Sequence, residues 1–307
     1  EIDLLPSGGP VADCDGRGTF AAGIVAARAD RDTTFAGIAP GAKILPIRYT
    51  QSTSDSESSG GDPGTLATAI TRAVDAHAGV ILVVVPSGAD SPALRAAVTR
   101  AHAAGDVVVS PAAASQQGAR SFPTATPGVL GVGAVDQAGA AVQSESGDYV
   151  AIAAPGANLV STSAGANGRI GLMWPVRDPS FAAAYVAGTV ALLKSYRPDL
   201  TPEQIANRLA LTASRPAGGA HDGKLGWGVL DAYAAVSAEL PANAAGPGAP
   251  VGPAAAKPVV PAAAPAPVRS PYNWAGIAAV LGVVVAGAVV FGAATVRRGR
   301  RRGWRMG

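Results

Sequence analysis

The sequence predicts an α/β domain built on a mostly parallel sheet covered by helices on both faces, followed by one C-terminal transmembrane helix. Short β-branched runs at residues 42–49, 79–85, 106–111, 128–135 and 149–155 alternate with alanine-rich stretches. Near-continuous apolar strands joined by helices are typical of a parallel sheet that is buried on both faces. The uncharged segment 274–296 has 23 residues, which at about 1.5 Å per residue is enough to cross a bilayer.

Composition and charge narrow the class of protein. The chain has 307 residues, of which 48% are hydrophobic and 15% charged, and this excludes a disordered chain solvated by its own charges. The formal net charge is +3, but residues 297–307 contain six arginines, without which it falls to −3. The basic character therefore belongs to the tail, and we expect no nucleic-acid partner for the rest of the chain.

Four segments follow one another along the chain. Residues 1–240 form a globular head, and residues 241–273, rich in proline and alanine, form a semi-rigid linker. Residues 274–296 span the lipid bilayer, and the arginines of 297–307 place the tail in the cytoplasm by the positive-inside pattern. This predicts a single-pass cell-membrane protein with an extracytoplasmic head. A buried helix of a large core and a cleaved sorting tail are the alternatives for the apolar segment.

The N-terminal part raises two expectations. The sequence starts at Glu1 without a charged and apolar leader, whereas an exported domain needs one. We therefore expect a leader to have been removed or the sequence to be truncated. Cys14 is the only cysteine, and it is either a small buried residue or a thiol without its partner.

Three segments carry a resemblance to a known family. Residues 13–24 read DCDGRGTFAAGI, residues 35–42 read FAGIAPGA, and residues 179–188 read PSFAAAYVAG. They resemble the catalytic-histidine segment, the Gly-(Val/Ile)-Ala-Pro turn and the nucleophile segment of the subtilisin-like serine proteases, over residues 11–238. With the linker, span and tail, the chain resembles the mycosins, which are membrane-anchored subtilases of type VII secretion systems. This resemblance implies a cell-envelope protease that is exported with a signal peptide and bound to the membrane components of that machine.

The same resemblance assigns the site residues, and two of them are substituted. Ser180 stands at the nucleophile position, Arg17 at the histidine position and Ser115 at the position of the oxyanion asparagine. A guanidinium is always protonated and cannot accept the serine proton, and losing the histidine of such a protease costs roughly 10⁶-fold in kcat. Losing the oxyanion donor costs roughly 10²–10³-fold. We expect Arg17 to fill the histidine space and to pair with Asp15 or Asp178.

The rest of the machinery is not evident in the sequence. His77 and His102 fall on predicted sheet-covering helices, and His221 falls in a polar loop where we expect a solvated side chain. The family's aspartate ends an early strand that this sequence lacks, and Asp3 is too close to Arg17 to replace it. Asp178 and Pro179 stand where the family has Gly-Thr, and Ser180 alone could equally be an ordinary helix N-cap.

Three hypotheses follow. The first is a proteolytically inactive mycosin-like scaffold of the secretion complex. The second is an active serine endopeptidase in the cell envelope, whose peptide substrates are segments of secreted proteins. The third is a remnant that does not fold stably, because the missing first strand leaves an unpaired sheet edge. The sequence suggests no cofactor, no metal site and no phosphate-binding loop.

Overall fold

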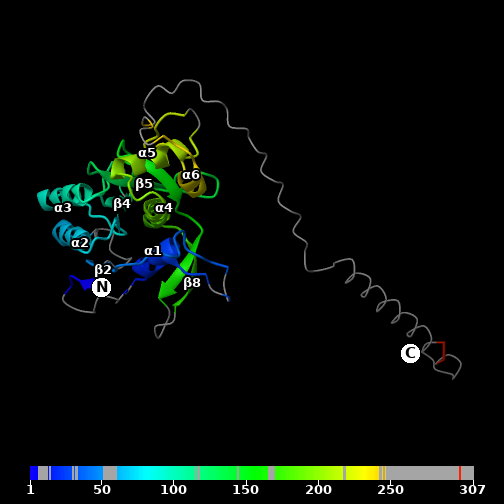
Figure 1. Ribbon diagram of the computed structural model, residues 1–307. Coiled ribbons are helices and arrows are strands. Elements are labelled where there is room, and N and C mark those ends of the chain that lie inside the picture. The colour runs from blue at the N-terminus through cyan, green and yellow to red at the C-terminus, as the bar shows by residue number, and fades with distance from the viewer. Residues whose placement is uncertain are drawn as a thin grey trace. The chain divides into compact units, whose positions relative to one another are not determined.

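The computed structural model describes residues 1–5, 13, 15–29, 31, 34–50, 61–114, 116, 118–143, 145–164, 170–216, 219–241, 244, 246 and 297–298 (Figure 1). The chain divides into two compact units, Glu1–Val251 and Gly252–Gly307. In the second unit the structure describes only Arg297 and Arg298, both exposed. Cys14, Ser115 and the predicted span 274–296 lie outside the described residues. Within those residues, every helix is too short or too polar to cross a bilayer.

The centre of the first unit is the predicted parallel sheet. Its four strands lie in the order β3, β4, β5, β6, and all neighbours run parallel. Their bounds are Val80–Leu82, Val107–Pro111, Val129–Val135 and Val150–Pro155. Each lies inside a run of β-branched residues expected to be a strand, and β4 is buried along its whole length.

Helices cover both faces of this sheet, as predicted (Figure 1). The helices are α1 (Arg17–Ala26), α2 (Pro63–Asp75), α3 (Pro92–Ala103), α4 (Ala182–Tyr196), α5 (Pro202–Thr212) and α6 (Ala232–Ser237). One apolar cluster contains Leu66 of α2, Leu94 of α3 and Val108 of β4. The second contains Ile24 of α1 and residues of α4, α5 and α6, together with Val109 of β4.

Two smaller sheets were not predicted in this form. Strand β1 (Ile2–Asp3) pairs in parallel with β2 (Ile47–Arg48), and Arg48 forms an ion pair with Asp3 at 3.2 Å. Strands β7 (Leu159–Ala164) and β8 (Ile170–Val176) form an antiparallel pair. No described strand joins the β1–β2 sheet to the central sheet.

The N-terminus of α2 is well defined although the preceding residues 51–60 lie outside the described part. The helix begins at Pro63, and Asp62 is its N-cap. The Asp62 carboxylate accepts from the Thr65 amide at 2.7 Å and so caps this helix. These hydrogen bonds from Thr65 lower the pKa of Asp62, and a proline at the first helical position needs no donor there.

Candidate functional site

Arg17 is the first residue of α1. The preceding Gly16 has a φ of +78°, a backbone conformation that favours glycine. The Asp13 carboxylate accepts from the Thr19 amide at 2.6 Å, which ties the incoming chain to the first turn. The Arg17 side chain therefore leaves the helix N-terminus from a fixed position.

Helix α1 is held against the rest of the site by two kinds of contact. The Ser161 hydroxyl donates to the Phe20 carbonyl at 2.6 Å, and the Thr162 hydroxyl donates to the Thr19 carbonyl at 2.9 Å. A Cβ atom at Gly23 would overlap both hydroxyls, so only glycine permits this close approach of α1 to β7. The Phe20 ring also packs on Phe181, with centroids 4.4 Å apart.

Ser180 lies in η2, a short 3₁₀-helix (Pro179–Phe181) that leads into α4. It is only 5% exposed. The Asp178 carboxylate accepts from the Ser180 amide at 2.9 Å, so Asp178 is the N-cap of this turn. The alternative interpretation of Ser180 as the N-cap is therefore wrong.

Arg17 and Asp178 meet across 161 residues of sequence. The Arg17 Nη1 atom lies 2.8 Å from an Asp178 oxygen, and its Nε atom lies 3.0 Å from an Asp15 oxygen. The predicted pairing of Arg17 with Asp15 or Asp178 is confirmed, and the structure has both ion pairs. One carboxylate thus connects the histidine position to the backbone of the nucleophile position.

This arrangement opposes nucleophilic catalysis in three ways. Arg17 has no lone pair with which to take a proton from Ser180. The Ser180 amide already donates to Asp178, so it is not free to stabilise an oxyanion. Among the described residues, no side chain hydrogen-bonds the Ser180 hydroxyl, and the Asp178 carboxylate that accepts from the Ser180 amide would repel an oxyanion developing beside that amide.

The three histidines have other partners or positions. His77 is exposed just beyond α2, and His102 of α3 lies 2.8 Å from the Glu203 carboxylate. His221 contacts the Val150 carbonyl at 2.8 Å, and its ring meets Trp227 edge-on. The expectation of a solvated His221 is wrong, because this half-buried ring fastens its loop to β6. In the part of the chain that the structure describes, no hydrogen bond or ion pair joins any of these histidines to Arg17 or Ser180.

A buried carboxylate that the sequence did not reveal lies beside the segment of Ser115. Glu145 is fully buried, and its two oxygens accept four hydrogen bonds. The donors are the Ala114 amide at 2.7 Å, the Ser121 amide at 2.8 Å, the Ser121 hydroxyl at 2.7 Å and the Tyr149 hydroxyl at 2.9 Å. Burial, together with this bond to Glu145, raises the pKa of Tyr149. Glu145 thereby fixes the backbone next to the position where the family's oxyanion donor would stand.

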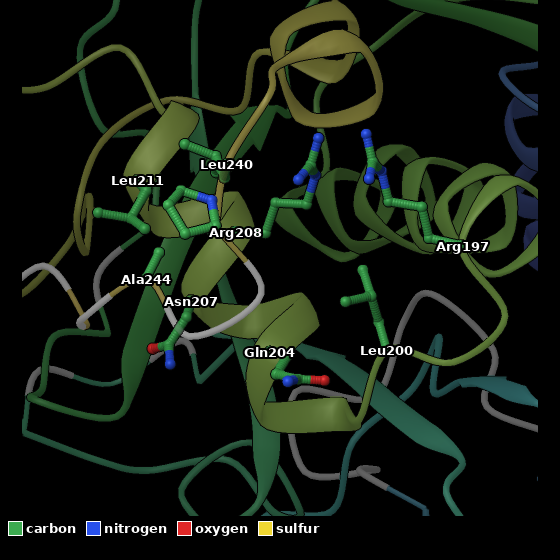
Figure 2. Close-up of a pocket in the computed structure, with 9 residues that line it drawn as sticks. Arg197, Leu200, Gln204, Asn207, Arg208, Leu211, Leu240 and Ala244 are labelled. Carbon is green, nitrogen blue, oxygen red and sulfur yellow. The ribbon is translucent and has the colours of Figure 1, made fainter.

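A pocket elsewhere in the head contains two arginines (Figure 2). In Figure 2 the guanidiniums of Arg197 and Arg208 point to the same side. Arg208 donates to the carbonyls of Ala235 and Ala238 at the end of α6, and burial beside Arg197 lowers its pKa. The pocket contains no residue of the Arg17–Asp178–Ser180 cluster. Within the described residues, no three side chains of the metal-ligating types gather at one point.

Comparison with known proteins supports the resemblance. The model of the subtilase family, Peptidase_S8, matches residues 7–228. Mycosin-3 of Mycobacterium tuberculosis (strain ATCC 25618 / H37Rv) is 34% identical over 360 residues, which cover 98% of this chain and 75% of that protein.

Solved structures give the same result. The structure of the MycP3 protease from the type VII (ESX-3) secretion system has a TM-score of 0.65 at 32% identity, covering 78% of this chain and 77% of that one. A chain in the structure of an intact ESX-5 inner membrane complex has a TM-score of 0.67 at 28% identity, covering 95% and 80%. The similarity is thus spread over the fold and is not confined to the motifs.

Proposed function

This chain belongs to the subtilase family, and from that premise we propose that it is a proteolytically inactive, mycosin-like scaffold of a type VII secretion membrane complex. The observation that carries the proposal is the ion pair of Arg17 with Asp178 at 2.8 Å. It fills the histidine position with a permanent cation, and Asp178 occupies the backbone donor of Ser180. The proposed substitution of the oxyanion asparagine by Ser115 acts in the same direction.

The cellular setting of the proposal comes from the relatives. Similarity to Mycosin-3, and to a chain of the ESX-5 inner membrane complex, supports membrane components of such a complex as partners. In this proposal residues 1–240 are the extracytoplasmic head and residues 241–273 the linker. Residues 274–296 are the membrane span and 297–307 the cytoplasmic tail, whose arginines follow the positive-inside pattern.

Reaction with a fluorophosphonate probe tests the loss of catalysis. We expect no labelling of the wild-type chain, of Ser180→Ala or of Arg17→His, because in the last variant Asp178 still holds the Ser180 amide. An active subtilase under the same conditions is the positive control. Labelling of the wild type that disappears in Ser180→Ala would demonstrate an activated serine and overturn the proposal in favour of the endopeptidase. Labelling of Arg17→His alone would show that Arg17 is the single block.

The partner is tested separately in cells. A tagged full-length chain should co-purify with the components of the membrane complex, and Ser180→Ala should co-purify equally well, because a scaffold does not use the hydroxyl. Recovery of the complex with the wild type but not with Ser180→Ala would contradict a scaffold role.

A further inference from the structure

The pocket in Figure 2 lies where the end of α4, helix α5 and the chain after α6 meet, and we call it the arginine pocket. Its volume is about 90 Å³, well below the roughly 300–1,000 Å³ of sites that enclose a whole small molecule. A space of this size takes one side chain. Two of its nine lining residues are arginines and none is acidic. The lining residues are Arg197, Leu200, Gln204, Asn207, Arg208, Leu211, Leu240, Pro241 and Ala244.

Arg208 is a buried cation that is bonded along only part of its guanidinium. It is 5% exposed, and its Nε and Nη2 atoms donate to the carbonyls of Ala235, Val236 and Ala238 at the end of α6. Among the described residues, the Nη1 atom makes no hydrogen bond, although it carries two of the five guanidinium donors. Carbonyls at a helix end hold only partial negative charge, so they do not neutralise Arg208.

Arg197 adds a second cation to the same pocket. Its one ion pair within the described part of the chain is with Glu239 at 3.6 Å, and the Glu239 side chain is 92% exposed. An ion pair so open to solvent is weak. In Figure 2 the two guanidiniums point to the same side, and burial together with the charge of Arg197 lowers the pKa of Arg208. Two cations thus share one weakly held carboxylate, and a further anion between them would be attracted to both.

The linker that starts at this pocket cannot supply that anion. Pro241 and Ala244 line the pocket, but residues 240–307 contain neither aspartate nor glutamate. Three leucine side chains complete the walls. The pocket therefore suits a carboxylate that another molecule presents on an aliphatic stem.

Exposed aromatic side chains near the same elements favour a protein as that molecule. In the described part of the chain, three large apolar side chains are exposed, namely Ile44, Tyr196 and Tyr233. Tyr196 directly precedes Arg197 at the end of α4. Tyr233 lies in α6, the helix whose end accepts from Arg208. Tyrosine and arginine are both enriched in protein–protein interfaces and among the residues that carry their binding energy.

We propose that the arginine pocket binds one glutamate or aspartate side chain from an acidic segment of a partner protein. The carboxylate accepts from Arg208 Nη1 and from the Arg197 guanidinium, and such charge-assisted bonds are stronger than neutral ones. The aliphatic stem contacts the leucine side chains. This recognition surface holds for a scaffold and for a protease alike and does not involve Ser180, so its failure and that of the proposed function are distinguishable.

The test uses the full chain in nanodiscs of zwitterionic lipid and a fluorescently labelled peptide in which glutamate alternates with leucine. We expect saturable binding that weakens with added salt, and binding at least tenfold weaker for the same peptide with glutamine in place of glutamate. Arg197→Gln should weaken binding about tenfold, because a hydrogen bond between charged groups is lost. Arg95→Gln is the matched control, since this exposed arginine also forms an ion pair, with Asp90, but lies outside the pocket.

Glu239→Gln gives a change in the opposite direction. It removes the carboxylate that competes for Arg197 and should tighten binding about two- to fivefold. Equal binding of the glutamine peptide would overturn the proposal. Binding that Arg197→Gln leaves unchanged would also overturn it, because the peptide would then lie elsewhere, for example on the arginines of 297–307. Inorganic phosphate that binds through Arg197 when the peptide does not would show a site for free anions and overturn it as well.

Discussion

Asp178 has two roles that can be separated by substitution. Its carboxylate caps the turn at the Ser180 amide, and it forms an ion pair with Arg17. Asp178→Ala removes both interactions, whereas Asp178→Asn keeps a capping oxygen and removes the charge. Arg17→Ala removes the ion pairs and leaves the cap in place.

The magnitudes follow from geometry and exposure. Losing an N-cap costs about 1 kcal/mol. The Arg17 and Asp178 side chains are 30% and 21% exposed, so their pair is partly screened and contributes about 0.2–1 kcal/mol. Asp178→Ala should therefore lower the free energy of unfolding by about 1–2 kcal/mol, and Asp178→Asn and Arg17→Ala by less than about 1 kcal/mol each.

Urea unfolding followed by tryptophan fluorescence measures these values, and the Arg17→Ala/Asp178→Ala double variant completes a cycle. The coupling between the two positions should lie within the range of the ion pair and should shrink in high salt. If Asp178→Asn costs as much as Asp178→Ala, the cap makes no contribution. A zero coupling energy would refute the claim that Arg17 stabilises the site through Asp178.

Three further predictions concern residues outside this pair. Glu145→Ala should lower the free energy of unfolding by about 3–5 kcal/mol, because two buried donors of Ser121 and two partly buried donors, of Ala114 and Tyr149, lose their acceptor. The exposed Glu239→Ala should be near neutral in the same urea unfolding, and equal effects would contradict the assigned network. Gly23→Ala should lower the free energy of unfolding by about 1–3 kcal/mol, because the added methyl group overpacks the contact with β7. Gly41→Ala is the control and should have little effect, since a Cβ there meets nothing within 4 Å. Equal melting temperatures of the two variants would show that α1 can move away from β7. Burial raises the pKa of Asp106 above its ordinary value of 3.8. Between pH 3.8 and this raised pKa, the folded state holds a proton on Asp106 that the unfolded state has released. The free energy of unfolding should therefore fall as pH rises through this interval. Asp106→Asn should remove this pH dependence of stability and raise the melting temperature at pH 7. A pH profile identical to that of the wild type would contradict the assignment of this dependence to Asp106.

The fold was largely predictable because its signals are local. β-Branched runs predicted the four central strands to within a few residues, and buried strands of this kind need no partner to be recognised. Strand β1 escaped prediction because two residues become a strand only by pairing with Ile47 and Arg48, more than 40 positions away. Strand β7 reads LVSTSA, and its hydroxyl-bearing residues resemble a loop in sequence although they bind α1.

The site was predictable only in part, for a related reason. The pairing of Arg17 with Asp178 followed from the two segments that carry the resemblance, once both were placed at one site. Glu145 gave no such signal, because its segment, QSESGD, is as polar as a surface loop. Its burial depends on donors from three separate places, Ala114, Ser121 and Tyr149. The contact of His221 with Val150 is likewise a product of tertiary packing.

The attachment of α1 to β7 has a mechanical consequence. The hydroxyls of Ser161 and Thr162 hold the first turns of α1, and β8, paired with β7, ends two residues before Asp178. The paired strands β7 and β8 are therefore connected to both partners of the Arg17–Asp178 ion pair, to Arg17 through the hydroxyl bonds on α1 and to Asp178 through the chain. A displacement of these strands would act on both sides of the ion pair at once.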